Sequence, residues 1–487
     1  MKLILIKDSF LKVIMVKKIL VLLVAVWAMG FASYSQNWSL QKCVEVARQN
    51  SLALKQNQIL IERNRIALIQ AQQNLYPNLS SNLNYRINFG RTIDPTTNDF
   101  ENQSISQNSF GFSTGMVLYN GGALKNSISQ TKVNVETAQL DAEQFANDLA
   151  LTVVQFYIAI LFAEERLDNA RIQLRTTTEQ LNQVDRLIVA GARPEGDRLE
   201  ILAQQARDEQ TIITNQNTVN ANKLGLKQLL RLPIEEVFEI QRPAPDAIQP
   251  SFIEENLNAI YNYALDHRAD MKSGDLKIKS AEMGVKIQKA NYVPTVTLGG
   301  SLSSLYSSLG RRITGTQTVK SPVTVEFNGQ QTTLGIFNES PVFGKNPYFK
   351  QLDQNLGYGI GAGVSIPIYN NYRARGLVRN AELTVEANKL SFEQNKQTLR
   401  NNIQTALNDY EAAKRTYEAS RRTAAATQLA YNNMKTKYDL GSANTFELVS
   451  SKNRWDIAKV EEILGRYELI FRSKVIDYYL GRPVNLN

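Results

Sequence analysis

The sequence lacks the residues on which several classes of chemistry depend. Its 487 residues include one cysteine, Cys43, and one histidine, His267. A disulfide framework needs paired cysteines and a structural zinc site needs several Cys or His ligands, so both are excluded. A Ser-His-Asp triad would have to use His267, and the sequence has neither a G-x-x-x-x-G-K-[ST] loop nor an H-E-x-x-H helix. We expect no enzyme activity, no catalytic residue, no cofactor and no bound metal.

The sequence also has few prolines and only a small excess of positive charge. There are 13 prolines, and 55 basic residues stand against 46 acidic ones, for a net charge of +9. Five of the lysines lie in the first 35 residues, so the rest of the chain is only mildly basic. Nucleic-acid-binding domains carry a clustered basic patch, and none is present here, so no nucleic-acid partner is expected.

The longest purely apolar run lies near the N-terminus. Two lysines, an apolar run and a group of small residues follow one another at 17–18, 19–29 and 32–35. This order is typical of a secretory signal peptide. A membrane anchor is the alternative, but it needs ~20 apolar residues, and the run has about 11. We expect residues 1–35 to be cleaved after Ser35, with Met1 or Met15 as the start, and no later segment to cross a membrane as a helix.

The chain consists of two similar halves. Landmark residues recur at an offset of 217 in Asn50/His267 and Pro77/Pro294, and at an offset of 250 in Tyr119/Tyr369 and Gly191/Gly441. Chance similarity rarely holds one offset over so many residues, so we infer an internal repeat. The offset changes once, which places a single insertion at about 309–355, where we expect a cell-surface loop.

The repeat defines the regions of the chain. Residues 1–35 are the signal peptide, 36–243 the first repeat, 244–250 a proline-rich linker and 251–487 the second repeat. Each repeat is predicted to contain a helix, a strand pair and a helical hairpin. The first helix is expected at about 39–75, the strand pairs at about 78–119 and 294–369, and the hairpins at about 124–231 and 374–481.

The predicted strands are long and alternate between apolar and polar residues. Leu79, Leu83 and Tyr85 alternate with polar residues in the first strand. Glycines alternate with apolar residues at 356–368. Crossing a bilayer takes ~9–11 tilted residues, whereas globular strands have ~5–6, so length and export favour membrane strands over a soluble sandwich. Four strands cannot close a barrel, and lipid does not tolerate an open edge, so other copies of the chain must complete the sheet.

The helices carry a coiled-coil repeat. From Leu149 to Ile188, apolar and small residues are spaced alternately four and three positions apart. The mean period is near 3.5 residues, which predicts a left-handed supercoil. The matching series in the second half contains four tyrosines, which we assign to packing: Tyr410, Tyr417, Tyr431 and Tyr438.

Together these features resemble the TolC family of outer-membrane efflux ducts. The resemblance covers about 38–483 and is carried by the duplicated halves, by the Tyr-Pro break at 76–77, and by the segments 89–96 and 191–197. It implies a mainly α fold with transmembrane β strands. Three copies would form a twelve-stranded outer-membrane β-barrel, four strands from each protomer, continued by a twelve-helix coiled-coil tunnel in the periplasm. The homotrimer would be a passive channel surrounded by outer-membrane lipid.

The resemblance also implies partners. A periplasmic adaptor (membrane fusion) protein and an inner-membrane RND or ABC pump would supply small molecules for efflux. A type I secretion duct for proteins stays open. So does a periplasmic coiled-coil adaptor or structural protein, although an adaptor needs one hairpin and a soluble strand domain, whereas this chain has two hairpins and two strand pairs.

In this family the hairpin turns dock the adaptor, and acids just beyond them line the closed entrance. The matching turn residues are Gly191, Ala192, Arg193, Gly441, Ser442 and Ala443, and the matching gate acids are Asp197, Glu447 and Glu200. Rings of acids in a narrow aqueous neck favour cations. Helix starts also favour acids, and tight turns favour glycine, so a purely structural role stays open. Some members lock the gate with a basic residue in the second turn, where this chain has Ala443-Asn444; Arg193 and Arg198 lie in the first half instead.

Overall fold

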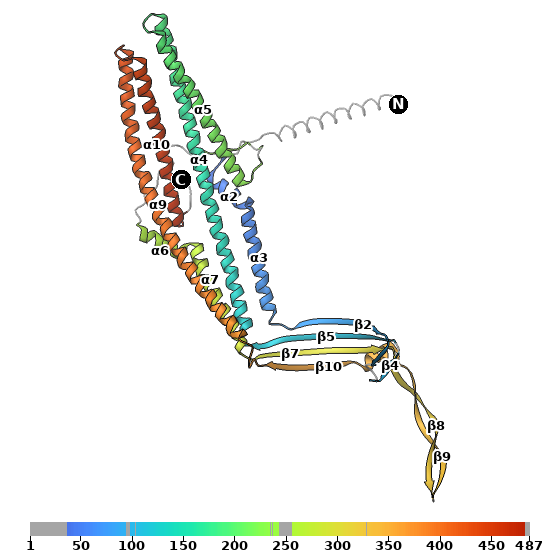
Figure 1. Ribbon diagram of the computed structural model, residues 1–487. Helices are drawn as coiled ribbons and strands as arrows, with labels where there is room; N and C mark the ends of the chain where they lie inside the picture. Colours follow the sequence, from blue (N-terminus) through green and yellow to red (C-terminus); the bar gives the residue numbers. More distant parts are fainter. Residues whose placement is uncertain are drawn as a thin grey trace, which may run out of the picture. The chain divides into compact units, whose positions relative to one another are not determined.

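The chain divides into two compact units, each assembled from distant parts of the sequence. The computed structural model describes residues 37–93, 98–102, 104–233, 235, 237–242, 256–327 and 329–482 (Figure 1). The predicted signal peptide and linker lie outside these residues. The first unit comprises Met1–Leu60, Ala138–Gly274 and Ser391–Asn487, and the second Ile61–Thr137 and Asp275–Leu390.

Two long helical hairpins supply most of the first unit. They are built from α4 (Ala123–Val189) with α5 (Glu195–Leu230), and from α9 (Arg373–Asp439) with α10 (Thr445–Tyr479). Both α4 and α9 have 67 residues, and the offset of 250 carries one onto the other, which confirms the internal repeat. Tyr410, Tyr431 and Tyr438 are buried, so their assignment to packing is also confirmed.

Each half begins with a helix that is interrupted at one residue. The four pieces are α2 (Leu40–Asn50), α3 (Leu52–Gln73), α6 (Leu257–His267) and α7 (Ala269–Lys289). The expected continuous helix at 39–75 is therefore wrong. Ser51 and Arg268, which share the offset of 217, are extended with ψ of 116° and 137°. The Ser51 hydroxyl accepts a hydrogen bond from the Leu54 N–H at 3.3 Å, so one residue ends α2 and caps α3.

An apolar cluster joins both hairpins at the level of α2. It includes Cys43 of α2, Tyr157 of α4, Leu226 of α5 and Ile470 of α10. The Tyr157 hydroxyl donates toward the Gln241 carbonyl at 2.5 Å. That contact supports the short parallel pair of β1 (Asn37–Trp38) and β6 (Glu239–Ile240).

One helix departs from the expectation that no later segment could cross a membrane. Within the described residues, α4 contains an 18-residue window with a mean hydropathy of 1.7. By length and composition alone, this window is apolar enough to cross a membrane. Its apolar residues Val153, Val154 and Ile160 are wholly buried in the cluster around Tyr157. Packing against the other helices therefore accounts for part of this apolar segment, of which 39% is buried.

The second unit contains a four-stranded antiparallel sheet. Its strands, in order, are β10 (Gly357–Ser365), β7 (Thr295–Ser307), β5 (Ile105–Asn120) and β2 (Asn78–Asn88). The pairing of β5 with β7 joins the two repeats, and β2 and β10 are open edges. The register places Leu79, Phe112, Leu302 and Ile360 on one face. Leu79 is 77% exposed and Ile360 is 88% exposed, so this chain alone leaves an apolar face uncovered.

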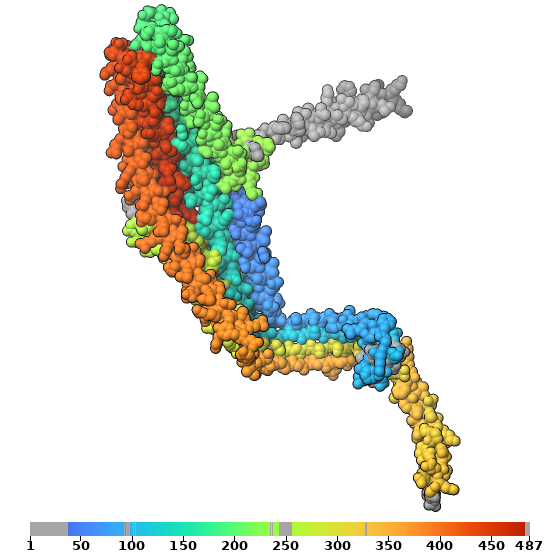
Figure 2. Space-filling model, in the orientation of Figure 1, coloured from blue at the N-terminus to red at the C-terminus, as the bar shows by residue number. Residues whose placement is uncertain are grey.

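The insertion of the second repeat is an ordered hairpin, which corrects the expected loop. Its strands are β8 (Arg311–Phe327) and β9 (Gln330–Lys345), followed by the short helix α8 (Tyr348–Gln354). The hairpin continues from the end of β7 and stands clear of the sheet (Figure 2). At the corresponding place, the described residues of the first repeat form the small pair β3 (Arg91–Ile93) and β4 (Phe100–Asn102). A 3-10 turn, η1 (Ala290–Tyr292), precedes β7.

Candidate functional site

The two hairpin turns of the first unit are closed in the same way. Gly191 has φ +71° and Gly441 has φ +77°, a region that side chains with a Cβ adopt with strain. The N–H of Gly191 bonds the Ile188 carbonyl at 2.9 Å, and that of Ala192 bonds the Leu187 carbonyl at 2.8 Å. The same two bonds close the second turn. This is the Schellman pattern, so glycine at both positions has a backbone reason.

The helices that leave the two turns start differently. In the second turn, the Asn444 side chain accepts from the Glu447 N–H at 2.8 Å, and the Glu447 carboxylate accepts from the Asn444 N–H at 3.0 Å. This capping box satisfies two helix-end donors. In the first turn Pro194 occupies the cap position and makes no side-chain cap bond. The helix start of α5 therefore lacks the local stabilisation that α10 has.

Arg193 joins the two turns. Its guanidinium lies 4.3 Å from the centre of the Tyr438 ring. One nitrogen, Nη2, is 3.3 Å from the carbonyl oxygens of both Tyr438 and Ala443, while Nη1 is 3.6 Å from Asp197. The side chains of Arg193 and Asp197 are only 16% and 18% exposed. One side chain of the first hairpin is thus bound to the backbone and an aromatic ring of the second.

The structure places the three predicted gate acids in different settings. Asp197 pairs with Arg193, and its Oδ2 is buried without a hydrogen-bond donor among the described residues. Glu447 belongs to the capping box, although its side chain remains at the surface. Glu200 is half-buried on α5. Arg198 bonds Asp185 at 3.0 Å inside its own hairpin and does not take part in the link between the turns.

A buried polar network, which the sequence patterns do not predict, lies beneath the turns. Gln204 of α5 donates to Asp208 at 2.7 Å and accepts from Asn453 of α10 at 3.2 Å. Nearby, Lys452 is 1% exposed and pairs with Asp456 at 2.9 Å. Burial raises the pKa of the Asp456 carboxyl, and Lys452 opposes that rise. The spacing of four residues between Lys452 and Asp456 was the available signal for an ion pair on one helix face.

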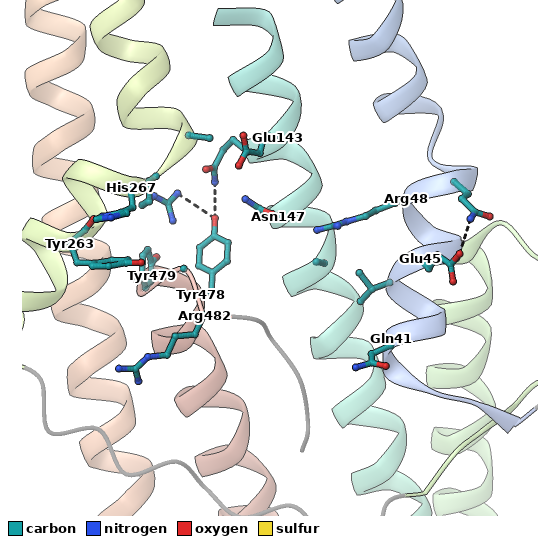
Figure 3. Close-up of a pocket in the computed structure, with 17 residues that line it drawn as sticks. Gln41, Glu45, Arg48, Glu143, Asn147, Tyr263, His267, Tyr478, Tyr479 and Arg482 are labelled. Atoms are coloured by element: carbon teal, nitrogen blue, oxygen red, sulfur yellow. Dashed lines mark hydrogen bonds between the residues drawn. The ribbon is translucent and has the colours of Figure 1, made fainter. Parts of the chain in front are cut away.

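A cavity of about 710 Å³ lies among α2, α4, α6, α7 and α10 (Figure 3). On its wall, Arg268 bonds both carboxylate oxygens of Asp270 at 3.0 and 2.8 Å, and its guanidinium faces the Tyr478 ring at 5.0 Å. His267 stacks on Tyr263 at 4.0 Å and bonds the Tyr263 carbonyl, so its contacts are not those of a Ser-His-Asp triad. Among the described residues no group of three acids, histidines or cysteines could hold a metal.

The sequence profile described as outer membrane efflux protein matches residues 43–230 and 260–482. None of the curated proteins matches the chain. Among solved structures, CusC is similar with a TM-score of 0.73 and 15% sequence identity. The match covers 92% of this chain and 96% of the CusC chain. VceC from Vibrio cholerae gives 0.69 at 12%, covering 91% and 94%. The open-state MtrE channel of Neisseria gonorrhoeae gives 0.70 at 17%, covering 92% and 90%. These likenesses confirm the predicted fold of the chain.

Proposed function

Since the chain belongs to the outer membrane efflux protein family, we propose that three copies form a passive exit duct for small molecules in the outer membrane. Membership of this family places the chain in the outer membrane and in the class of efflux channels. The profile match spans both repeats, and this observation carries the proposal.

The sheet supports assembly from several copies. Lipid offers no partner for the unpaired N–H and C=O groups along β2 and β10, so an open sheet is not stable in a bilayer. Joining β2 of one copy to β10 of the next removes both edges. Exposed apolar residues such as Leu79 and Ile360 then face lipid, as in other barrels whose strands cross a membrane. Three copies give twelve strands, and the helices continue the duct into the periplasm.

The hairpin turns are the proposed periplasmic entrance. Gly191, Ala192, Arg193, Gly441, Ser442 and Ala443 form the surface that docks a periplasmic adaptor, which links the duct to an inner-membrane RND or ABC pump. The open space around the two glycines supports this role, since no atom lies within 4 Å of a Cβ built there. Asp197, Glu447 and Glu200 are the proposed gate acids, which favour cations at the entrance.

Arg193 is the proposed lock of this gate. Two hairpins that must separate to widen the entrance are held together by its contacts with Tyr438 and Ala443. The same guanidinium partly neutralises Asp197. Releasing Arg193 would therefore free the hairpins and expose the acid in one step.

Fractionation followed by native mass measurement in detergent tests the proposal. The mature chain should be found in the outer membrane with three times the monomer mass. The class of pump that copurifies after cross-linking, RND or ABC, would identify the export system. A monomer in detergent, or a soluble periplasmic species, would contradict the duct.

A further inference from the structure

One face of the β8–β9 hairpin, called its apolar face below, carries six aliphatic side chains that no described residue covers. Directly opposed residues of an antiparallel pair point to the same side, and the register opposes Val323 to Leu334 and Ser321 to Ile336. The apolar residues on this face are Val319 (37% exposed), Val323 (37%), Val325 (40%), Leu334 (53%), Ile336 (44%) and Val342 (37%). The other face carries Thr318, Lys320, Thr324, Thr333 and Glu339, and also the exposed Ile313, Phe337 and Phe343.

Such a hairpin needs a partner. A two-stranded sheet is marginally stable alone in water, and its stability grows when an apolar face packs against another element. The strands have 17 and 16 residues, about three times the ~5–6 residues of an ordinary strand. The apolar face therefore runs along most of a long element that has no second layer among the described residues.

The strand edges favour packing by the face over pairing by the edge. Each strand contains a proline, Pro322 in β8 and Pro341 in β9. Proline has no N–H to donate, and in sheets it is confined to edges whose N–H side is free. Each outer edge thus carries a residue that opposes the addition of a further strand. Contact between apolar faces meets no such obstacle.

The base of the hairpin is fixed to the sheet. Gln351 of α8 is 1% exposed. Its amide nitrogen donates to the Ser307 and Asn346 carbonyls at 3.0 and 2.8 Å, and its oxygen accepts from the Ser307 N–H at 3.0 Å. The Asn346 N–H also bonds the Gly310 carbonyl at 2.9 Å. These bonds tie the end of β7, the end of β9 and α8 together, so the hairpin leaves the sheet from an ordered base.

We propose that the β8–β9 hairpins of three copies pack their apolar faces against one another over the outer mouth of the duct. This inference rests on the proposed trimer. Twelve strands spaced ~4.8 Å apart and tilted by ~40° give a barrel radius of ~12 Å, which places equivalent points on the rim ~20 Å apart. Sixteen residues at ~3.3 Å each extend ~50 Å, so neighbouring hairpins are long enough to meet. Attachment to one rim also gives them a high effective concentration for each other, which favours a second copy over a free partner.

Single-cysteine cross-linking tests the proposal in outer membranes. Val323→Cys introduces a thiol on the apolar face, and Thr324→Cys introduces one at the adjacent residue, which lies on the opposite face. Native Cys43 can remain, because it is wholly buried and burial raises the pKa of its thiol to about 12. A short bismaleimide should give covalent dimers with Val323→Cys, at least tenfold more than with Thr324→Cys.

The outcomes separate this inference from the proposed function. A trimeric mass without cross-linking of Val323→Cys, or with equal cross-linking of both variants, would overturn hairpin packing and leave the duct intact. Protection of Val323→Cys from a water-soluble maleimide without cross-linking would also overturn it, in favour of lipid or another protein. A monomeric mass in detergent would reject the proposed function itself. As a second variant, replacing 312–344 with a short turn should preserve the trimer and leave the mouth open to larger solutes.

Discussion

Replacing Arg193 with alanine should open the periplasmic entrance. A cation–π contact removed from water contributes ~1–2 kcal/mol, and a hydrogen bond from a charged donor contributes ~1.5–3 kcal/mol at good geometry. The two bonds of Arg193 are 3.3 Å long, so we assign ~1 kcal/mol to each. The link then stabilises the closed arrangement by about 3 kcal/mol in each protomer, which is roughly a hundredfold in the closed-to-open ratio.

Conductance of the purified trimer in planar lipid bilayers measures this effect. Arg193→Ala should raise the mean conductance and the fraction of time spent open. Arg193→Lys keeps the positive charge near Asp197 but loses the planar fork and its stacking on Tyr438, so it should fall between the wild type and Arg193→Ala. High salt should change the conductance of the wild type less than Arg193→Ala does, because salt screens the contacts of Arg193 with the carbonyls and the ring only weakly.

Arg198→Ala is the matched control. Arg198 lies five residues further along, carries the same charge, and bonds Asp185 and Glu195 inside the first hairpin at 3.0 and 3.3 Å. Its removal should leave conductance close to that of the wild type. Equal opening by both alanine variants would show that net charge at the turn matters and the link does not. An unchanged conductance in Arg193→Ala would refute the lock.

Three further predictions follow from the first unit. Asp197→Asn with Glu447→Gln, which keeps the capping box, should lower cation preference and divalent block; unchanged selectivity in bilayers would reject the gate acids. Gly441→Arg should weaken cross-linking to the adaptor while the trimer mass in detergent stays unchanged. Lys452→Met should destabilise the protein to thermal unfolding by ~3 kcal/mol, because Asp456 loses its buried partner, and Lys452→Met with Asp456→Leu should restore most of it.

Much of the fold could be predicted from the sequence because it is repeated. Gly191 and Gly441 share one offset, and both have positive φ, since the same backbone turn requires glycine at each. The alternation of apolar and polar residues predicts the four long strands, and their length together with the export signal favours a membrane location. Ser51 was not recognised as a break, because one polar residue in a helical pattern carries no sign that it ends one helix and caps the next.

Less of the candidate site at the hairpin turns could be predicted from the sequence. Arg193 was assigned to a turn, but its contacts with Tyr438 and Ala443 lie 245 and 250 residues away, and a single sequence does not give the register between two hairpins. The insertion that contains β8 and β9 predicts only a loop, because it has no counterpart in the first repeat from which strands could be inferred. Its apolar face emerges only when the pairing of Val323 with Leu334 is known.

The link made by Arg193 also bears on how a duplicated chain evolves. Arg193 and Ala443 occupy the same position in the two repeats, and the arginine bonds the backbone of its own counterpart. Two copies of the first repeat would set two arginines against each other, and two copies of the second would have none. The ring contact depends on a further difference, since Tyr438 corresponds to Ile188 in the first repeat. Restoring identical halves would change this contact, so the asymmetry of the two turns depends on the differences between the two repeats.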